Sequence, residues 1–196
     1  MTTQVFVVSA LRPPIGTFGG SLKDASLSDL ATRVVKPAFN KDGVVTAGNS
    51  SGLNDGAAAL VLASEKAVRK HNLKPVARIV SYGFAGVEPR LMGIGSVPAA
   101  QIALAQAGLR TSAIDVVEAN EAFAAQAYAV SRLLDLDPER VNPHGSGISL
   151  GHPIDATDAI ISTKAVHELQ RTGGRYALAT LCIGGGQGIA AVRERT

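Results

Sequence analysis

The sequence predicts an α/β domain. Short runs rich in apolar and β-branched residues alternate with segments in which apolar residues recur at helical spacing, as expected when helices cover a sheet. The 196 residues are 46% hydrophobic and 18% charged, a composition typical of globular proteins. A chain of this length can bury roughly 70% of its unfolded surface. These features favour an enzyme domain over a disordered or tail-like segment.

The expected elements follow in chain order. Strands are predicted over residues 4–9, 57–63, 77–82, 115–119, 175–182 and 188–192. Helices are predicted over residues 28–35, 64–71, 98–107, 123–134 and 156–170. Local signals support several boundaries: Ser64 is placed as an N-cap, Pro98 suits a first turn, and Gly108 and Gly173 stand where helices should stop.

Composition excludes several classes of protein. The net charge is +3, the Lys and Arg residues are scattered, and three Tyr and five Phe offer little for base stacking, so we expect no nucleic-acid partner. One cysteine precludes an internal disulfide and fits a reducing compartment. No run approaches the ~20 apolar residues of a membrane span, and no secretory signal precedes the first strand. We therefore expect a cytoplasmic protein, with no membrane association, bound metal or permanent cofactor.

Two motifs carry chemistry. Cys182, the single cysteine, is followed by a glycine-rich run up to Gly188, and Gly151-His152-Pro153 lies thirty residues earlier. A thiol that can ionise, a histidine that exchanges protons near neutral pH, and backbone amides free of side chains together suit acyl transfer or carbon–carbon chemistry at a thioester. Each feature alone has an ordinary explanation, because lone cysteines are often core residues and glycine runs are often turns.

Two further blocks make the pattern specific. They are Asn-Glu-Ala-Phe-Ala at residues 120–124 and Thr-Ala-Gly-Asn-Ser-Ser-Gly-Leu-Asn-Asp-Gly-Ala at residues 46–57. In this order and spacing, the four blocks resemble the C-terminal half of the thiolases, the acyl-CoA C-acyltransferases, and are most similar to the bacterial biosynthetic and broad-chain β-ketothiolases. The resemblance implies a layered αβαβα fold with a mixed sheet. It also implies condensation of acetyl-CoA with an acyl-CoA, or thiolysis of a 3-ketoacyl-CoA.

The resemblance divides the chain into two parts. Residues 36–196 look like the C-terminal thiolase domain, and residues 1–35 look like a remnant of the N-terminal domain. The family's nucleophilic cysteine lies in a Cys-Gly-x-Gly context, and no such motif occurs in this sequence. We therefore expect weak thiolase activity, or none, from this chain by itself.

The resemblance also implies catalytic roles. His152 would take the proton of the nucleophilic thiol and help to bind the thioester oxygen. Cys182 would exchange the α-proton of acetyl-CoA, Gly184 would offer an oxyanion-hole amide, and Asn120 would hold an oxyanion water with His152. Asn120 has an ordinary alternative as the N-cap of the following helix, and both roles are compatible.

Three more residues are implied at the substrate. Ser51 matches a serine at the pantetheine of coenzyme A, whereas Phe123 and Met92 match residues that line the acyl pocket. Ordinary packing is the alternative for Phe123 and Met92. The substrates would be coenzyme A thioesters, and the chain would form a homo-oligomer or serve as a thiolase subunit.

Two aspartates depart from the family pattern. Asp155 and Asp158 stand where the motif after Gly-His-Pro usually has glycine. In one interpretation Asp155 is the N-cap of the next helix and Asp158 lies in its first turn, where negative charge is favourable. In the other interpretation, one of these carboxylates lies close to His152 and raises the pKa of the imidazole. A histidine that stays protonated cannot act as a base.

Three alternatives to a thiolase stay open from the sequence alone. The chain could bind acyl-CoA or pair with a thiolase subunit without catalysis. It could be a thioesterase based on Cys182, which needs one thiol, one base and an oxyanion hole. It could also be a truncated product with no evolved function.

Overall fold

The computed structural model describes residues 37–196, so the strand predicted over residues 4–9 and the helix over residues 28–35 lie outside the described residues. The predicted remnant of the N-terminal domain, residues 1–35, also lies outside the described residues. The chain divides into two compact units, residues 1–49 and residues 50–196. In the described part of the first unit, Ala38 N donates to Val45 O at 2.8 Å, and a short 3-10 helix, η1, spans Ala47–Asn49.

The second unit is built on a four-stranded mixed sheet with strand order β1-β4-β3-β2. Its strands are β1 (Ala77–Gly86), β2 (Val116–Ala119), β3 (Tyr176–Ile183) and β4 (Gln187–Arg195). β2 and β3 are parallel, whereas the other two pairs are antiparallel. The two parallel strands therefore present their carboxyl ends at the same edge of the sheet.

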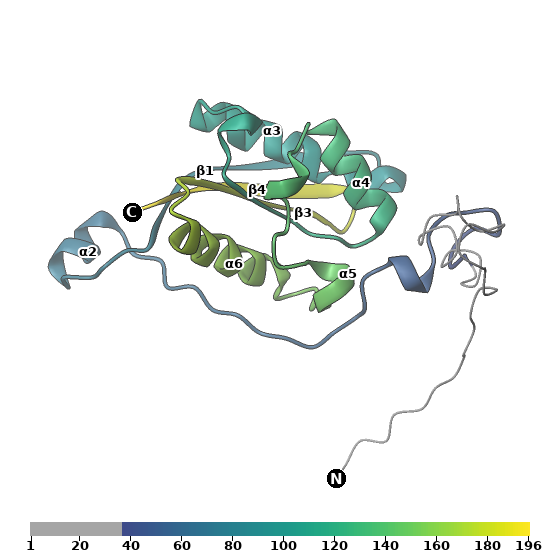
Figure 1. Cartoon of the computed structure of the whole chain (residues 1–196), viewed down its shortest axis with the longest axis horizontal. Helices are drawn as coiled ribbons and strands as arrows, with labels where there is room; N and C mark the ends of the chain where they lie inside the picture. The colour runs from purple at the N-terminus through teal and green to yellow at the C-terminus, as the bar shows by residue number, and fades with distance from the viewer. Residues whose placement is uncertain (1–36) are drawn as a thin grey trace, which may run out of the picture. The chain divides into compact units, whose positions relative to one another are not determined.

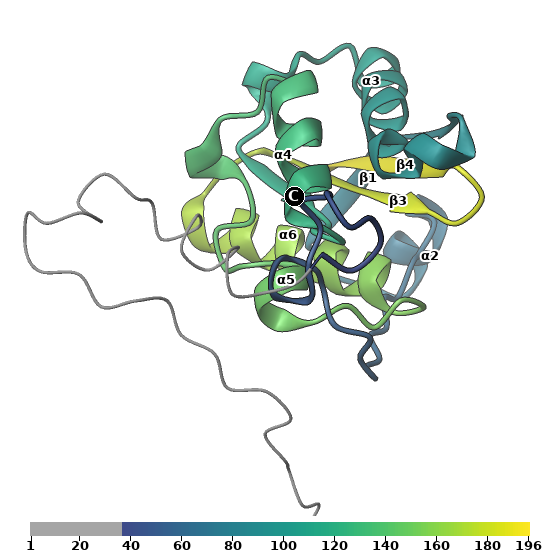
Figure 2. The ribbon, with the colours of Figure 1, turned by 90° about the vertical axis from the view of Figure 1, so that its right-hand side faces the viewer.

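Helices cover both faces of this sheet. The helices of the described residues are α2 (Glu65–Lys70), α3 (Ser96–Ala107), α4 (Ala124–Leu133), α5 (Gly147–Leu150) and α6 (Thr157–Thr172), of which α2 buries no residue and lies beside the sheet (Figure 1). Short 3-10 helices η2 (Pro89–Ile94), η3 (Thr111–Ala113) and η4 (Pro138–Arg140) lie in the connections. α3 and α4 lie on one face, and α5 and α6 on the other (Figures 1 and 2). The α/β class with a mixed sheet is as predicted.

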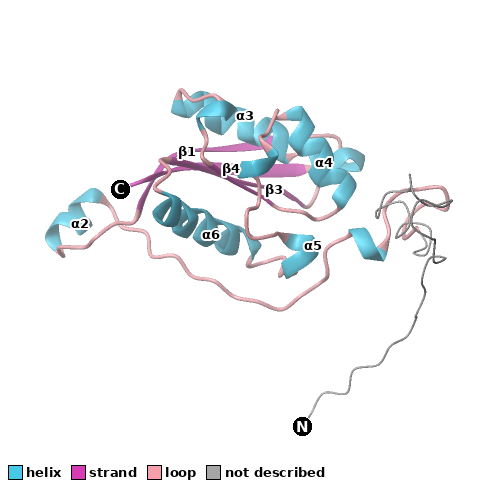
Figure 3. Ribbon diagram, viewed as in Figure 1, coloured by secondary structure: helices cyan, strands magenta, loops and turns pink. Residues whose placement is uncertain are grey.

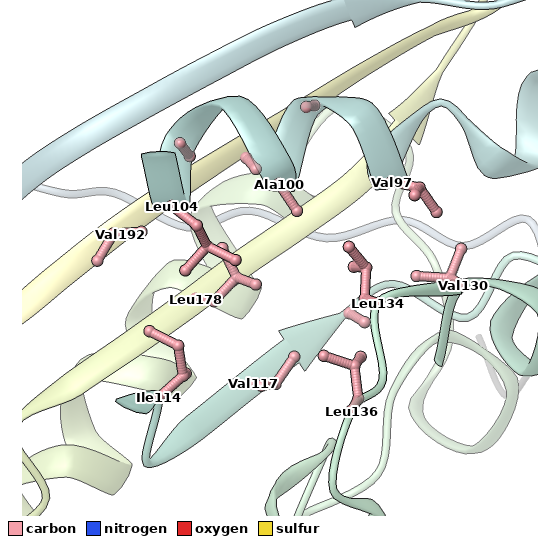
Figure 4. Packing of buried hydrophobic residues seen from close by; sticks show 14 residues of the cluster. Val97, Ala100, Leu104, Ile114, Val117, Val130, Leu134, Leu136, Leu178 and Val192 are labelled. Atoms are coloured by element: carbon pink, nitrogen blue, oxygen red, sulfur yellow. The ribbon is translucent and has the colours of Figure 1, made fainter. Parts of the chain in front are cut away.

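The larger core lies between the sheet and the α3 face. Small residues of α3 allow the helix to approach the strands, and larger apolar side chains fill the remaining space (Figure 4). The labelled members of this cluster are Val97, Ala100, Leu104, Ile114, Val117, Val130, Leu134, Leu136, Leu178 and Val192. On the opposite face, Ala165 and Leu169 of α6 pack against Val116 and Ala177.

Local signals correctly predicted several helix ends. Ser64 caps α2, its Oγ accepting from Ala67 N at 3.2 Å. Gly108 and Gly173 end α3 and α6 in the left-handed conformation, with φ of 67° and 76°. Such φ values cost glycine little, because it has no Cβ to clash with the backbone.

The strand predicted over residues 57–63 is wrong. These residues form an exposed extended loop outside the sheet, with no hydrogen bond or strand partner among the described residues (Figure 3). Apolar composition alone does not make a strand, because a strand also needs a neighbour for its backbone groups. No sequence pattern predicted η2 and α5, which are short and contain glycine.

Candidate active site

Asn120 follows β2 directly and is buried, with 1% of its surface exposed. Its backbone N–H donates to Thr180 O on β3 at 3.0 Å, which continues the parallel ladder by one residue. Gly147 packs closely against it, because a Cβ there would lie 3.0 Å from Asn120 Oδ1 and 2.7 Å from Glu121 O. Glycine at residue 147 therefore leaves room for the Asn120 amide.

The alternative role of Asn120, as the N-cap of the following helix, is wrong. The N-cap of α4 is Phe123, three residues later, and Gln126 Oε1 accepts from the backbone N–H groups of Ala122 and Phe123 at 3.1 and 3.4 Å. Since Gln126 already satisfies the start of the helix, the side chain of Asn120 is directed elsewhere.

His152 is held at both ring nitrogens. Its Nε2 lies 3.3 Å from Asn120 Nδ2, and its Nδ1 lies 2.6 Å from Thr157 Oγ1. Thr157 Oγ1 donates to Pro153 O at 2.8 Å, so this hydroxyl must accept from an Nδ1–H group. Nε2 is then unprotonated and accepts from the Asn120 amide. The contacts thus select the tautomer whose free lone pair lies on Nε2.

Burial lowers the pKa of His152 below its ordinary value, which keeps the imidazole neutral at pH 7. This direction is opposite to the one expected if Asp155 stood close to the ring. Asp155 and Asp158 are both exposed. The hypothesis that these carboxylates hold His152 protonated is therefore not supported, and the residue is suited to act as a base.

The two aspartates differ in their relation to α6. Asp158 lies in the first turn of the helix, as expected. Asp155 is not the N-cap, because Ala156 occupies that position without a side-chain hydrogen bond. The turn after Pro153 brings Ala156 N and Thr157 N to Pro153 O, both at 2.9 Å, and this places the helix start one residue later than predicted.

Asn54 is a site residue that the sequence reasoning missed. Its Oδ1 accepts from His152 N at 2.9 Å, and Leu53 forms a parallel bridge with His152. Gly151 has φ of 100°, and a Cβ there would lie 2.7 Å from Asn54 Oδ1. Asn54 therefore positions the backbone of the Gly-His-Pro motif. The signal was its place inside the block at residues 46–57.

Cys182 lies near the end of β3, beside Gly188 of β4 in the antiparallel register. Burial raises the pKa of its thiol, so the protonated form is favoured at neutral pH. In the part of the chain that the structure describes, no hydrogen bond joins Cys182 to His152 or Asn120. Cys182 and Asn120 nevertheless lie toward the carboxyl ends of neighbouring parallel strands.

The turn between β3 and β4 leaves the Gly184 backbone accessible. Gly185 and Gly186 have φ of 74° and 81°, which turns the chain within a short hairpin. Gly184 is exposed, and a Cβ placed there would meet no atom within 4 Å. Its amide can therefore be reached by a ligand, as an oxyanion-hole role requires.

Of the three residues predicted to contact the substrate, two lie close together. Ser51 N donates to Ala122 O at 2.9 Å, and Ser50 forms an antiparallel bridge with Phe123, so Ser51 and Phe123 lie close together. Met92 lies in η2, which packs against α4 where Gly93 meets Gln126. All three side chains are half-buried.

An open hollow of about 490 Å³ lies beside the Gly-His-Pro motif, lined by residues 53–56 and 153–155. Within residues 37–196, no group of three or more His, Cys, Asp or Glu side chains could hold a metal ion. Over the same described range, no helix has the length and apolar character needed to cross a bilayer.

The layered α/β fold and the Asn120–His152 pair at the end of β2 define a thiolase-like class of protein, and comparison with known proteins establishes the family. Residues 73–195 match the thiolase C-terminal domain, and residues 32–66 match the thiolase N-terminal domain. The chain belongs to the thiolase family.

Individual relatives give the extent of the similarity. The chain is 62% identical over 173 residues to the β-ketothiolase BktB of Cupriavidus necator, covering 88% of this chain and 43% of that protein. It is 54% identical over 160 residues to the human mitochondrial 3-ketoacyl-CoA thiolase, and this match covers 82% of this chain and 40% of that protein. The chain thus spans less than half the length of these relatives.

Solved structures agree. The acetyl-CoA acetyltransferase of Bacillus anthracis superposes with a TM-score of 0.83 at 50% identity, covering 88% of this chain and 44% of that one. The human mitochondrial 3-ketoacyl-CoA thiolase in complex with CoA superposes with a TM-score of 0.79 at 47% identity, and the match covers 88% of this chain and 43% of that one. The predicted thiolase fold is confirmed.

Replacing Thr157 with valine is expected to let the His152 ring adopt both neutral tautomers. Without the hydroxyl that accepts from Nδ1–H, the Nε2–H form becomes populated, and the lost hydrogen bond costs about 1 kcal/mol. The ring ¹⁵N shifts of His152 measure the tautomer directly. Thr163→Val is the matched control, because Thr163 Oγ1 bonds to Ala159 O within α6, away from the ring. Unchanged shifts in Thr157→Val would contradict the assignment.

Replacing Asp155 and Asp158 together with asparagine is expected to leave the His152 titration midpoint within about 0.3 pH units, because exposed charges are screened by solvent. Stability should fall by about 0.3–1 kcal/mol, since Asp158 favours the N-terminus of α6. NMR titration and urea unfolding measure the two effects. A downward shift of one unit or more would show that a carboxylate acts on the ring.

Proposed function

We propose that this chain supplies the proton-transfer and oxyanion groups of a thiolase-type acyltransferase site that acts on coenzyme A thioesters. The supporting observation is the double anchoring of His152, whose Nε2 faces the Asn120 amide while Nδ1 is held by Thr157. This arrangement keeps a basic lone pair at a fixed position beside an amide N–H donor.

In the proposed chemistry, the thiolate of Cys182 removes an α-proton from the acetyl group, and the electron pair of the broken C–H bond forms an enolate. The negative charge on the thioester oxygen is stabilised by N–H donors, for which Asn120 and Gly184 are suited. The raised pKa of Cys182 makes its thiolate a stronger base but a less abundant one at neutral pH. His152, once protonated at Nε2, becomes a further donor to the oxygen.

Substrate binding is proposed for the residues around Ser51, Phe123 and Met92, with coenzyme A thioesters as ligands. The relative whose structure contains CoA supports this class of ligand. A homo-oligomer or thiolase-subunit assembly and a cytoplasmic setting belong to the same proposal. They are supported by the family and by the single reduced cysteine.

The thioesterase alternative has less support. A cysteine nucleophile needs a lowered pKa or a base in contact, whereas burial raises the pKa of Cys182 and its thiol has no hydrogen bond to His152.

The test separates the two halves of the reaction. The lone chain should not thiolyse acetoacetyl-CoA, because its sequence has no Cys-Gly-x-Gly nucleophile. It should exchange the acetyl protons of acetyl-CoA in D₂O faster than buffer, as followed by NMR. Cys182→Ala and His152→Ala should lose this exchange, whereas His71→Ala, at an exposed histidine, should retain it.

Exchange no faster than in buffer would overturn the proposed function. Thiolysis at a rate near that of ordinary enzymes, about 10 per second, would instead force Cys182 into the role of the nucleophile.

A further inference from the structure

We propose that residues 57–63, here named the apolar segment, are a docking strand for a separate polypeptide that carries the rest of a thiolase N-terminal domain. The inference rests on the proposed function only in naming the partner class. The binding surface itself is a property of the described chain.

The first observation is that every residue of the apolar segment is exposed. Leu60, Val61 and Leu62 are 44%, 94% and 75% exposed, and all seven residues have exposed side chains. Their backbone N–H and C=O groups make no hydrogen bonds within the described residues. The segment runs as an extended loop into α2 without joining the sheet (Figure 1). It therefore offers free backbone groups together with apolar surface.

The second observation is the residue pattern. The segment reads Ala-Ala-Ala-Leu-Val-Leu-Ala, with no polar residue. In a strand, Leu60 and Leu62 would point to one face and Val61 to the other. A strand that is apolar on both faces is typical of a sheet covered on both sides. The pattern suits the interior of a layered domain and not a solvent-exposed edge.

The third observation identifies the occupant. The match to the thiolase N-terminal domain spans only residues 32–66 and includes the whole apolar segment. More than half of each relative's length has no counterpart in the alignment with this chain. A strand of a covered sheet pairs with other strands of its own domain, so we place the partner of this segment in the stretch of the relatives that has no counterpart in this chain.

The segment is connected to the second unit through the chain on both of its sides. Upstream, Asn54 Oδ1 accepts from His152 N at 2.9 Å. Downstream, Ser64 caps α2, and Val76 O accepts from Gln170 Nε2 at 2.7 Å. A segment connected to a folded unit on both sides loses less conformational freedom on pairing than a free tail, which favours strand addition by a partner.

The experiment is co-expression of the full chain, carrying an affinity tag, with the part of the Cupriavidus necator β-ketothiolase that precedes the matching region. We expect a soluble complex of one copy of each polypeptide by light scattering. Backbone amides of residues 57–63 should exchange rapidly in the lone chain and become protected at least tenfold in the complex.

Leu60→Asp with Leu62→Asp is the disrupting variant, and Ala59→Pro is a second one that removes a backbone donor. Because the segment contacts little in the lone chain, neither variant should change its melting temperature. Both should weaken capture at least tenfold. Leu133→Asp is the matched control, since Leu133 is an exposed leucine of α4, 56% exposed, outside the segment.

Several results would overturn the inference: a partner recovered only in the insoluble fraction, capture that the segment variants do not weaken, or association of the chain only with itself. The same experiments test the proposed function independently. If a complex forms but neither exchanges acetyl protons nor thiolyses acetoacetyl-CoA, the docking strand is supported and the proposed function is contradicted. If the lone chain exchanges acetyl protons but no complex forms, the proposed function is supported and the docking strand is contradicted.

Discussion

Replacing Lys164 with methionine is expected to lower the free energy of unfolding by about 3–5 kcal/mol at pH 7, because it leaves a buried carboxylate unpaired. Glu118 on β2 is 0% exposed, and Lys164 Nζ on α6 donates to its Oε2 at 2.6 Å. The same Nζ also donates to Gly145 O. Burial raises the pKa of Glu118 even though Lys164 opposes the shift.

The loss should depend on pH. The pKa of Glu118 is higher in the folded state than in the unfolded chain, so the native state binds this proton more tightly, and stability falls as pH rises from the unfolded-state pKa to the folded-state pKa. Without Lys164 the gap widens, so the penalty is largest at neutral pH and smaller near pH 5. Urea unfolding at both pH values measures it.

Two further variants make the result specific. Lys70→Met, at an exposed lysine of α2, should cost less than about 0.5 kcal/mol. The double change Glu118→Gln with Lys164→Met should recover part of the loss, since no charge then stays buried. A loss that does not depend on pH, or equal losses at Lys164 and Lys70, would contradict the role of the ion pair.

This ion pair also connects the elements that build the site. Glu118 lies two residues before Asn120 on β2, and Lys164 lies two turns after Thr157 on α6. Asn120 follows β2 directly, and Thr157, which contacts His152, is the first residue of α6, so the ion pair joins the strand and the helix that flank the Asn120–His152 contact. Gly145, whose carbonyl Lys164 binds, precedes the Gly147 that packs on Asn120.

Local sequence predicted most of the described elements. Caps and stops such as Ser64, Gly108 and Gly173 depend on a few neighbouring residues, and they were predicted correctly. Residues 57–63 were not, because a strand depends on partners elsewhere in the chain. Asn120 was considered as an alternative N-cap of α4, yet Gln126 binds the backbone at the start of this helix.

The sequence motifs picked out side chains that the structure brings together, but they did not predict all of the contacts of these side chains. The motifs named His152 and Asn120, which the structure places within 3.3 Å of each other. Thr157 and Asn54 were not assigned roles, although both contact His152. Their roles depend on how the turn after Pro153 and the strand-like segment near Leu53 fold back on the histidine, which no local pattern specifies.

Alkylation of Cys182 by iodoacetamide is expected to be at least tenfold slower in the native chain than in the urea-unfolded chain at pH 7.5. Only the thiolate reacts, each unit of raised pKa lowers its fraction about tenfold, and burial also limits access. Cys182 is the single cysteine, so mass spectrometry reports this site alone, and the unfolded chain is an internal control.

The pH profile distinguishes an unreactive buried thiol from an activated one. The native rate should still rise with pH where the unfolded rate has levelled off, because the native pKa is the higher of the two. If the native thiol instead reacted faster than the unfolded one at neutral pH, Cys182 would have to be an activated thiolate. That outcome would favour the thioesterase alternative, whereas slow alkylation combined with acetyl-proton exchange fits a thiol that acts as a base and not as a nucleophile.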